Sequence, residues 1–170
     1  DVYKRQDLDY SVESNQVKQN LILREVPVIP DAAEYFGLSE GLRMPAGYAL
    51  FSGETMLGEE LFKTQEDLQI RHIETGELLV EIPAPMIMEA GAEEPYMGTF
   101  FVQDYGPEIL LITVVESDWL LDEDRVYPVA IDPSIRVNSA AGGYCYIYYA
   151  YCYSSAYRYH YRYYGSYYYV

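Results

Sequence analysis

The sequence predicts a mostly β fold: an antiparallel β-sandwich or curled sheet with one short helix at most, followed by a tyrosine-rich β-hairpin or meander. Two observations support this prediction. Runs rich in β-branched and aromatic residues recur roughly every ten residues, and Gly, Pro or clustered acids separate them. The spacing also leaves no room for the helical crossovers that parallel strands require, so the strands are expected to pair antiparallel.

The first predicted strands form a hairpin. Apolar and polar residues alternate over residues 8–14 and, in part, over residues 17–24, and Asn15-Gln16 between them offers a turn. Thr75-Gly76 and the YGPE segment at 105–108 are predicted to be short connections between antiparallel strands. Further strand signals cover residues 47–51, 67–73, 77–82, 99–105, 108–115 and 125–131.

Helix signals are sparse. Residues 31–42 form the main candidate, in which Asp31 could cap the first turn while Gly37 and Gly41 cut the helix short. Residues 117–122 can form a single helical turn that places Trp119, the one tryptophan of the chain, against the core.

Composition divides the chain into a mixed body and a biased tail. Of the 21 tyrosines, 14 fall between Tyr144 and Tyr169. We therefore expect a β-rich module over residues 7–135, a linker over 136–143 and a truncated tyrosine-rich β segment over 144–170. Residues 1–6 (DVYKRQ) resemble translated adapter sequence at the ends of metagenomic assemblies and are interpreted as an assembly artefact or a disordered end. The chain as a whole is interpreted as a fragment of a longer reading frame.

The charge is concentrated in the body. The tail holds two arginines and no acid, so the body carries 9 Lys and Arg against 27 Asp and Glu, a net charge of −18. Such a body should repel a phosphate backbone or an anionic membrane surface, which argues against nucleic acid as a partner. No run approaches the roughly 18 apolar residues of a membrane span.

The second half of the tail is predicted to carry an aromatic face. Because strand side chains alternate, Tyr157, Tyr159, Tyr161 and Tyr163 would share one side of a strand, with Arg158, His160 and Arg162 on the other. Three interpretations remain open. The tail could continue the sheet of the body, it could be a platform on which sugars or other polymers stack, or it could be low-complexity adhesive sequence.

The candidates for chemistry are few. Cys145 and Cys152 could form a disulfide only if the chain reverses between them, and with His160 they match neither the spacing nor the ligand count of a zinc site, so no metal is predicted. His72 lies alone in a strand pattern and is interpreted as a surface residue. No phosphate-binding, dinucleotide-binding, zinc-protease or serine-hydrolase motif is present, and no cofactor and no catalysis are expected.

Three segments together resemble a known arrangement. They are DLDY with NQVKQNLIL (residues 7–10 and 15–23), GELLVEIPAP (76–85), and WL with DRVYPVAIDPS (119–120 and 124–134). They are similar to the β-rich module that precedes DNRLRE domains and RHS (YD) repeats in large surface proteins, including wall-associated ones. The resemblance covers about residues 7–135 and implies secretion and a scaffold, adhesion or toxin-carrying role for the whole polypeptide. A DNRLRE-like domain would follow, and here the tyrosine-rich tail stands in that place.

The sequence therefore predicts a non-catalytic structural or adhesive module of an extracellular or cell-surface protein. Its expected partner is the rest of the same polypeptide, a downstream β domain or YD repeats. The alternative is a module that binds carbohydrate, such as cell-wall polysaccharide, through the tyrosine face. An enzyme fragment is the third and weakest hypothesis.

Overall fold

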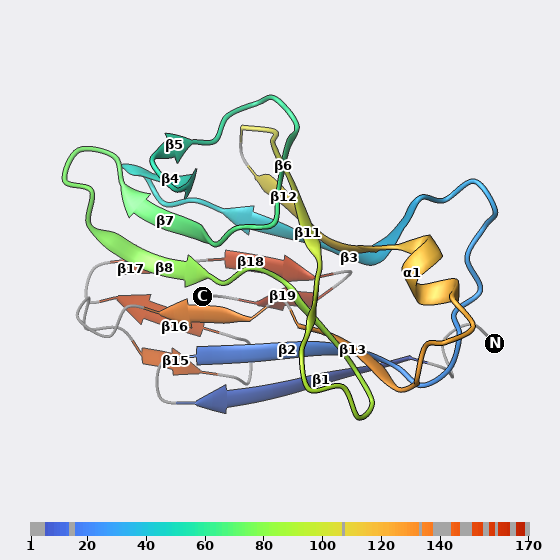
Figure 1. The fold of residues 1–170 in the computed structure, drawn as a ribbon. Coiled ribbons are helices and arrows are strands. Elements are labelled where there is room, and N and C mark those ends of the chain that lie inside the picture. Colours follow the sequence, from blue (N-terminus) through green and yellow to red (C-terminus); the bar gives the residue numbers. More distant parts are fainter. Residues whose placement is uncertain are drawn as a thin grey trace.

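A computed structural model describes residues 6–13, 16–106, 108–132 and 134–137, together with the backbone of five short strands in the tail. The fold is mostly β, every strand pair in the described part is antiparallel, and the same part contains one short helix. The predicted fold class is confirmed (Figure 1).

The body consists of two sheets. The strands of the larger sheet lie in the order β10-β9-β13-β2-β14-β8-β7-β4-β5, and β1 pairs with β2. Their bounds are β1 Gln6–Glu13, β2 Gln16–Leu23, β4 Tyr48–Ser52, β5 Thr55–Met56, β7 Leu68–His72, β8 Leu78–Ile82, β9 Met86–Glu89, β10 Tyr96–Met97, β13 Val129–Asp132 and β14 Ile135–Val137. The second sheet has the order β19-β18-β3-β12-β11-β6, with β3 at Tyr35–Arg43, β6 at Phe62–Thr64, β11 at Thr99–Asp104, β12 at Ile109–Glu116, β18 at His160–Tyr163 and β19 at Ser166–Tyr168.

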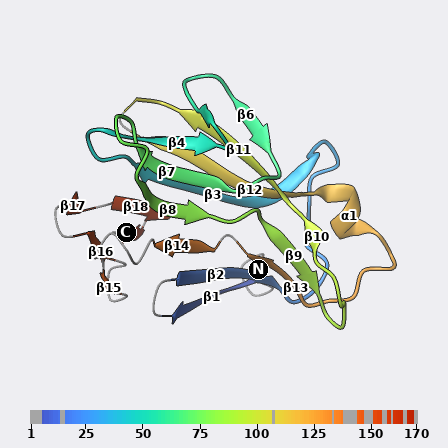
Figure 2. The ribbon, with the colours of Figure 1, turned by 60° about the vertical axis from the view of Figure 1, so that its left-hand side comes forward.

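In the larger sheet β9 is the neighbour of β13, and β8 is the neighbour of β14. The Pro-Ala-Pro segment at 83–85 separates β8 from β9, and the Pro-Ser pair at 133–134 separates β13 from β14. The register pairs Met86 with Asp132 on one side of the breaks and Glu81 with Arg136 on the other. Proline cannot donate to a ladder, and β8 and β13 both end directly before a proline of the sequence. Figure 2 shows the consequence: β9, β10 and β13 run toward the helix, while β7 and β4 extend at the opposite end.

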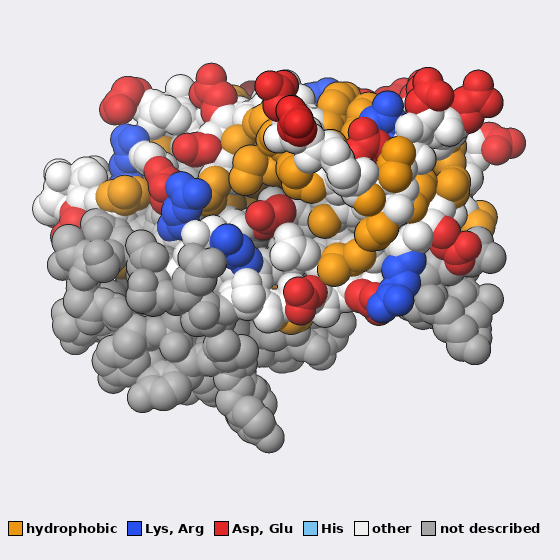
Figure 3. Space-filling view, turned by 60° about the horizontal axis from the view of Figure 1, so that its bottom comes forward, with side chains coloured by type: hydrophobic (Ala, Val, Ile, Leu, Met, Phe, Trp, Pro, Cys, Tyr) orange, Lys and Arg blue, Asp and Glu red, His pale blue; other side chains and the backbone are white. Residues whose placement is uncertain are grey.

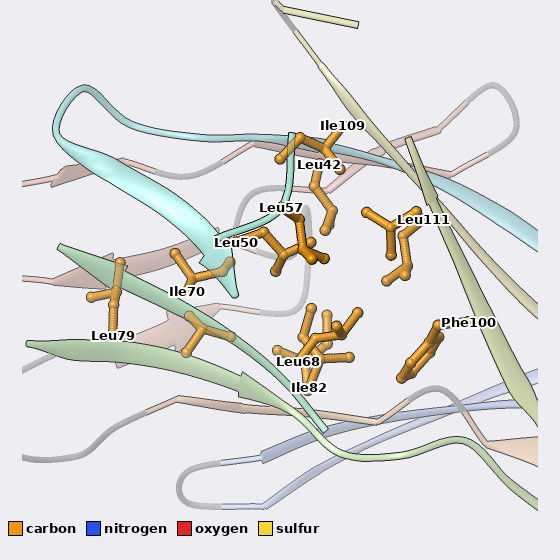
Figure 4. Packing of buried hydrophobic residues seen from close by; sticks show 13 residues of the cluster. Leu42, Leu50, Leu57, Leu68, Ile70, Leu79, Ile82, Phe100, Ile109 and Leu111 are labelled. Atoms are coloured by element: carbon orange, nitrogen blue, oxygen red, sulfur yellow. The ribbon is translucent and has the colours of Figure 1, made fainter. Parts of the chain in front are cut away.

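The interior is divided in the same way into two hydrophobic clusters. The large core lies between the β4-β7-β8 part and the second sheet, and its labelled side chains point into the space between the sheets (Figure 4). Its members are Leu42, Leu50, Leu57, Leu68, Ile70, Leu79, Val80, Ile82, Phe100, Val102, Ile109, Leu111 and Ile135. The small core lies under the helix and consists of Leu21, Leu23, Leu38, Ile87, Val115, Leu120, Val129 and Ile131. Strand residues alternate between core and exterior, which is the pattern that predicted the strands.

The hairpin and both predicted short connections are present. β1 pairs with β2 up to Glu13 opposite Gln16, so Gln16, which was expected in the turn, belongs to β2. Gly76 and Gly106 adopt φ of +69° and +84°, values that favour glycine, in the turns β7–β8 and β11–β12. The strand predicted over 125–131 begins only at Val129, because residues 125–128 cross from the helix to the sheet.

The prediction of a helix over residues 31–42 was wrong. Residues 31–32 form a turn, and the chain then enters the nine-residue strand β3. Leu38, Glu40 and Leu42 face the core with the alternation of a strand, and β12 pairs with β3 along its full length. Non-local pairing outweighs the weak helical preference of this glycine-interrupted segment.

The helix that does form is α1, Ser117–Leu121, where a single helical turn was expected. Leu120 is fully buried and Trp119 packs against the small core, as predicted. At five residues it is the longest helix of the described part, and no helix there has the length and hydrophobicity needed to cross a membrane.

Candidate aromatic surface site

Four aromatic rings gather at the α1 end of the molecule, and we call Tyr35, Phe101, Tyr96 and Trp119 the aromatic band. Tyr96 of β10 stacks on Trp119 of α1 with 4.6 Å between ring centroids and 14° between ring planes. The Tyr96 hydroxyl donates a hydrogen bond to Glu116 Oε2 at 3.0 Å. Tyr96 is nevertheless 36% exposed, so this fixed ring still presents surface to solvent.

A cation packs on the other member of the stacked pair. The Arg125 guanidinium carbon lies 4.6 Å from the centroid of the Trp119 ring, and Arg125 Nη1 donates to Glu89 Oε1 at 3.1 Å. The second carboxylate oxygen of Glu89 accepts a hydrogen bond from the backbone N–H of Val126 at 3.1 Å. The positions of Trp119 and Arg125 are therefore set by one connected set of contacts between β9, α1 and the segment that leads into β13.

The other half of the aromatic band lies on the outer side of the second sheet. Tyr35 and Phe101 meet edge to face with 5.1 Å between centroids. Lys63 Nζ donates to the Tyr35 hydroxyl at 2.8 Å and lies 5.4 Å from the Phe101 centroid. Glu116 connects the two halves, because it is the ladder partner of Tyr35 and the hydrogen-bond acceptor of Tyr96.

Hydrogen bonds to backbone carbonyls hold this end of the molecule together. The Ser117 N–H at the start of α1 donates to the Glu34 carbonyl at 2.9 Å, and the Tyr127 hydroxyl donates to the Leu120 carbonyl at 2.6 Å. Gly98 carries the chain from β10 to β11, that is, from one sheet to the other. A Cβ at Gly98 would lie 2.9 Å from the Val114 carbonyl oxygen, so this crossing depends on the missing side chain.

The electrostatics of the aromatic band keep the Tyr96 hydroxyl protonated. Burial, and then the hydrogen bond to the Glu116 carboxylate, raises the pKa of Tyr96 above its usual range. The hydrogen bond to Tyr35 raises the pKa of Lys63, so the ammonium stays charged. The aromatic band supplies flat apolar rings and hydroxyl groups, and the side chains that contact it supply carboxylates and two cations. Together these groups can bind a ligand that has ring faces and hydroxyl groups.

One polar pair lies inside the sandwich. Glu40 of β3 is 2% exposed, Gln19 of β2 is 4% exposed, and Gln19 Nε2 donates to Glu40 Oε1 at 3.0 Å across the two sheets. On β3, Glu40 lies between Leu38 of the small core and Leu42 of the large core. Burial raises the pKa of Glu40 to about 8, and the hydrogen bond from Gln19 opposes this rise. The carboxyl group is therefore protonated at neutral pH, and a buried charge is avoided.

The predicted tyrosine face is distributed over two sheets. Tyr157 belongs to β17 (Tyr157–Arg158), in a three-stranded sheet with β15 (Tyr144–Tyr146) and β16 (Tyr151–Ser154). Tyr161 and Tyr163 belong to β18, in the second sheet of the body, and Tyr159 lies outside the described residues. The side chains of the other three also lie outside the described part, so ligand binding by this face stays a prediction.

The two cysteines lie opposite each other in the backbone register. β15 and β16 are antiparallel, and Cys145 pairs with Cys152, so the chain reverses between them, as a disulfide would require. Opposite residues of an antiparallel pair have Cα atoms roughly 4.5–5.5 Å apart, within the range of a disulfide. The side chains lie outside the described part, and the disulfide stays a prediction.

A labelling experiment tests this disulfide. Chain purified from an oxidising compartment and unfolded in guanidinium without reductant should not react with iodoacetamide at Cys145 or Cys152, and prior reduction should make both react. Quantitative alkylation without reductant would contradict the disulfide.

His72 has a structural role in the turn between β7 and β8. Its Nδ1 accepts hydrogen bonds from the backbone N–H groups of Glu74 and Thr75, each at 3.3 Å, and its ring meets Tyr48 edge to face at 5.0 Å. Within the described ranges no three His, Cys, Asp or Glu side chains come together as metal ligands would.

Comparison with protein-family models, curated proteins and solved structures found no match. The resemblance to modules preceding RHS repeats therefore stays a hypothesis based on the sequence segments themselves.

Sequence reasoning missed the aromatic band. Its members lie on four elements that are far apart in the chain: Tyr35 on β3, Tyr96 on β10, Phe101 on β11 and Trp119 on α1. Only Trp119 was singled out, as a packing residue. Tyr35 was assigned to the predicted helix over 31–42, and Tyr96 lay between the predicted strands, so no pattern along the chain pointed to them.

Proposed function

We propose that the chain is a non-catalytic structural or adhesive module of a large secreted or cell-surface protein. In this proposal the module is joined to the rest of its polypeptide through a continuous β-sheet. The observation that carries the proposal is the pairing of β18, from the tyrosine-rich tail, with β3 of the body.

The pairing extends the second sheet of the body. β3 pairs with β12 along one edge, and on its other edge Arg43, Leu42, Gly41 and Glu40 pair with residues 160–163 of the tail. β18 then pairs with β19, so the sheet continues into the tail without a break. Main-chain hydrogen bonds of this kind hold the tail on the body with little dependence on side chains. They also cover an edge of β3 that could otherwise pair with another molecule and lead to aggregation.

The charge distribution supports the same proposal. The tail contains Arg158 and Arg162 and no acid, whereas the body carries a net charge of −18 (9 Lys and Arg against 27 Asp and Glu). Figure 3 shows Asp and Glu side chains along the upper edge and over the middle of this face, where they outnumber Lys and Arg. Opposite net charges favour association of the two parts, and a strongly charged surface keeps a secreted domain soluble.

Hydrogen exchange tests the sheet continuation. We expect the amides of residues 40–43 that face β18 to exchange faster in a chain ending at residue 143 than in the intact chain, because truncation leaves that edge open to water. The amides of β7, which lies between β4 and β8, serve as the internal control and should exchange equally in both chains. Equal exchange of residues 40–43 in both chains would contradict the proposed connection.

The complete reading frame tests the wider context. Downstream β repeats and an upstream secretion signal are the expected finding. A reading frame that ends shortly after Val170 and carries no export signal would overturn the assignment to a large surface protein, whatever the exchange experiment shows.

A further inference from the structure

We infer that the Tyr96–Trp119 end of the aromatic band is a binding site for a neutral polysaccharide, with the free face of Tyr96 as the platform for a sugar ring. This inference lies in the body of the chain and is independent of the proposed sheet continuation and of the tyrosine-rich tail.

The first argument is the geometry of the Tyr96 ring. One face of Tyr96 is covered by Trp119, which stacks on it within 14° of parallel. Tyr96 as a whole residue is still 36% exposed, so stacking on Trp119 does not close it off from solvent. Its hydroxyl is held by Glu116 and its neighbour Trp119 is held by α1, so the platform is ordered before any ligand arrives. Binding to such a platform costs little conformational entropy.

The second argument is the set of polar groups beside the platform. Glu116 accepts the hydrogen bond of the Tyr96 hydroxyl, so its carboxylate lies beside the ring. Asp118 is exposed in the first turn of α1, one residue before Trp119. Sugar hydroxyl groups donate to carboxylates, and the apolar C–H face of a sugar ring packs on an aromatic face. The platform therefore offers both kinds of contact that a sugar needs.

The third argument concerns charge and distinguishes between ligand classes. Glu93 and Glu94 are exposed three and two residues before Tyr96, Glu116 accepts the hydrogen bond of the Tyr96 hydroxyl, and Asp118 is exposed beside Trp119. An anionic ligand would therefore be repelled. A cationic ligand would ordinarily be attracted to rings and carboxylates. Here the cation position over Trp119 is already filled by Arg125, which is paired with Glu89 at 3.1 Å. A neutral ligand fits the remaining surface best.

The site lies at an accessible end of the fold. Figure 2 shows β10 and α1 next to each other at one end of the molecule, away from β15, β16 and β17. β10 is the terminal strand of the larger sheet, so no further strand of the described part covers it. An extended polymer could lie across this end without a pocket, as suits recognition of an internal segment of a polysaccharide.

Trp119 provides the measurement, because it is the one tryptophan of the chain and directly contacts the platform. The intact chain is titrated with neutral oligosaccharides built from glucose, mannose, galactose, xylose or N-acetylglucosamine, with tetramethylammonium and polygalacturonate as cationic and anionic probes. We expect a saturable change in Trp119 fluorescence, together with heat of binding, for at least one neutral oligosaccharide and for neither charged probe.

Variants locate the binding. Tyr96→Ala should weaken the affinity by at least about tenfold, the effect of removing a central aromatic contact. Tyr96→Phe should retain most of it, because the ring remains. Tyr105→Ala is the matched control. Tyr105 lies between β11 and β12, is 59% exposed, and its hydroxyl donates to Gln103 of β11. Removing the Tyr105 side chain should leave binding unchanged. Circular dichroism and the unfolding temperature verify that each variant is folded.

Three outcomes would overturn the inference. The first is that no neutral oligosaccharide of the panel binds, and the second is that a charged probe binds instead. The third is that Tyr105→Ala, or removal of residues 144–170, weakens binding as much as Tyr96→Ala does. Loss of binding on removal of the tail alone would assign carbohydrate recognition to the tail and not to the body.

Discussion

The free energy of unfolding is expected to fall as the pH rises from about 4.5 to about 8, because of Glu40. This carboxyl group has a pKa of about 8 in the folded chain, against 4.5 for its ordinary value, and burial is the main cause. In this interval the folded state holds a proton that the unfolded state releases. Each pH unit therefore lowers the free energy of unfolding by about 1.4 kcal/mol while the folded group stays fully protonated. The stabilisation is complete below the unfolded pKa and is lost as the pH passes the folded pKa.

Glu40→Gln should remove this dependence. The amide is uncharged and can still accept the hydrogen bond that Gln19 donates, so the variant should match the natural chain near pH 4.5 and exceed its stability by a few kcal/mol above pH 8. Urea unfolding at a series of pH values measures the difference. Glu60→Gln is the matched control, since Glu60 is exposed and the same charge is removed.

Parallel pH profiles for the natural chain and Glu40→Gln would contradict the assignment. Burial also raises the pKa of Asp132, and the hydrogen bond that the Ser134 hydroxyl donates to it opposes the shift. Asp132 therefore also makes the free energy of unfolding fall as the pH rises. This contribution is the same in the natural chain and in both variants, so it cancels when their pH profiles are compared.

Gly37→Ala should destabilise the fold strongly. Gly37 lies in β3 opposite Val114 of β12, and a Cβ there would lie 1.9 Å from the Thr113 carbonyl oxygen and 2.8 Å from the Val114 Cα. Both contacts are with backbone, which cannot move aside as a flexible side chain can, so β3 and β12 must separate. We expect a loss of roughly 3 kcal/mol, the upper end of ordinary overpacking effects.

Thermal unfolding measures this loss, which corresponds to a fall of roughly 6–12 °C for a chain of this size. Gly58→Ala is the matched control, because a Cβ at Gly58 meets nothing within 4 Å. It should change the stability by less than about 0.5 kcal/mol. Equal unfolding temperatures for the two variants would show that β3 and β12 do not approach as closely at Gly37 as described.

Gly37 also illustrates why the sequence misled at β3. In a local interpretation, a glycine within residues 31–42 shortens a helix. In the folded chain the same glycine permits the close approach of a neighbouring strand that is more than 70 residues away in sequence. Local preference is a weak guide wherever the decisive partner is remote. The short strands β5, β6 and β10 escaped prediction for a related reason, since two or three residues are too few to show an alternation.

Several features were determined by the sequence alone. Alternation of apolar and polar residues predicted the β1–β2 hairpin and strands β4, β7, β8, β11 and β12, because one face of each strand must be buried. Gly, Pro and clustered acids between the strand signals predicted where strands end, in the case of proline because it lacks the N–H that a ladder requires. Gly76 and Gly106 predicted turns, because a positive φ is unfavourable for other residues. All of these signals are local in the chain.

Only the tertiary structure decided which strands become neighbours and what their side chains meet. It paired β9 with β13, put Glu40 against Gln19 in the interior, and stacked Tyr96 on Trp119. Each of these contacts joins residues at least 21 positions apart, as the buried pair Gln19–Glu40 shows. The physical reason is that pairing and packing depend on the total burial reached by the whole chain, and no single segment carries that information.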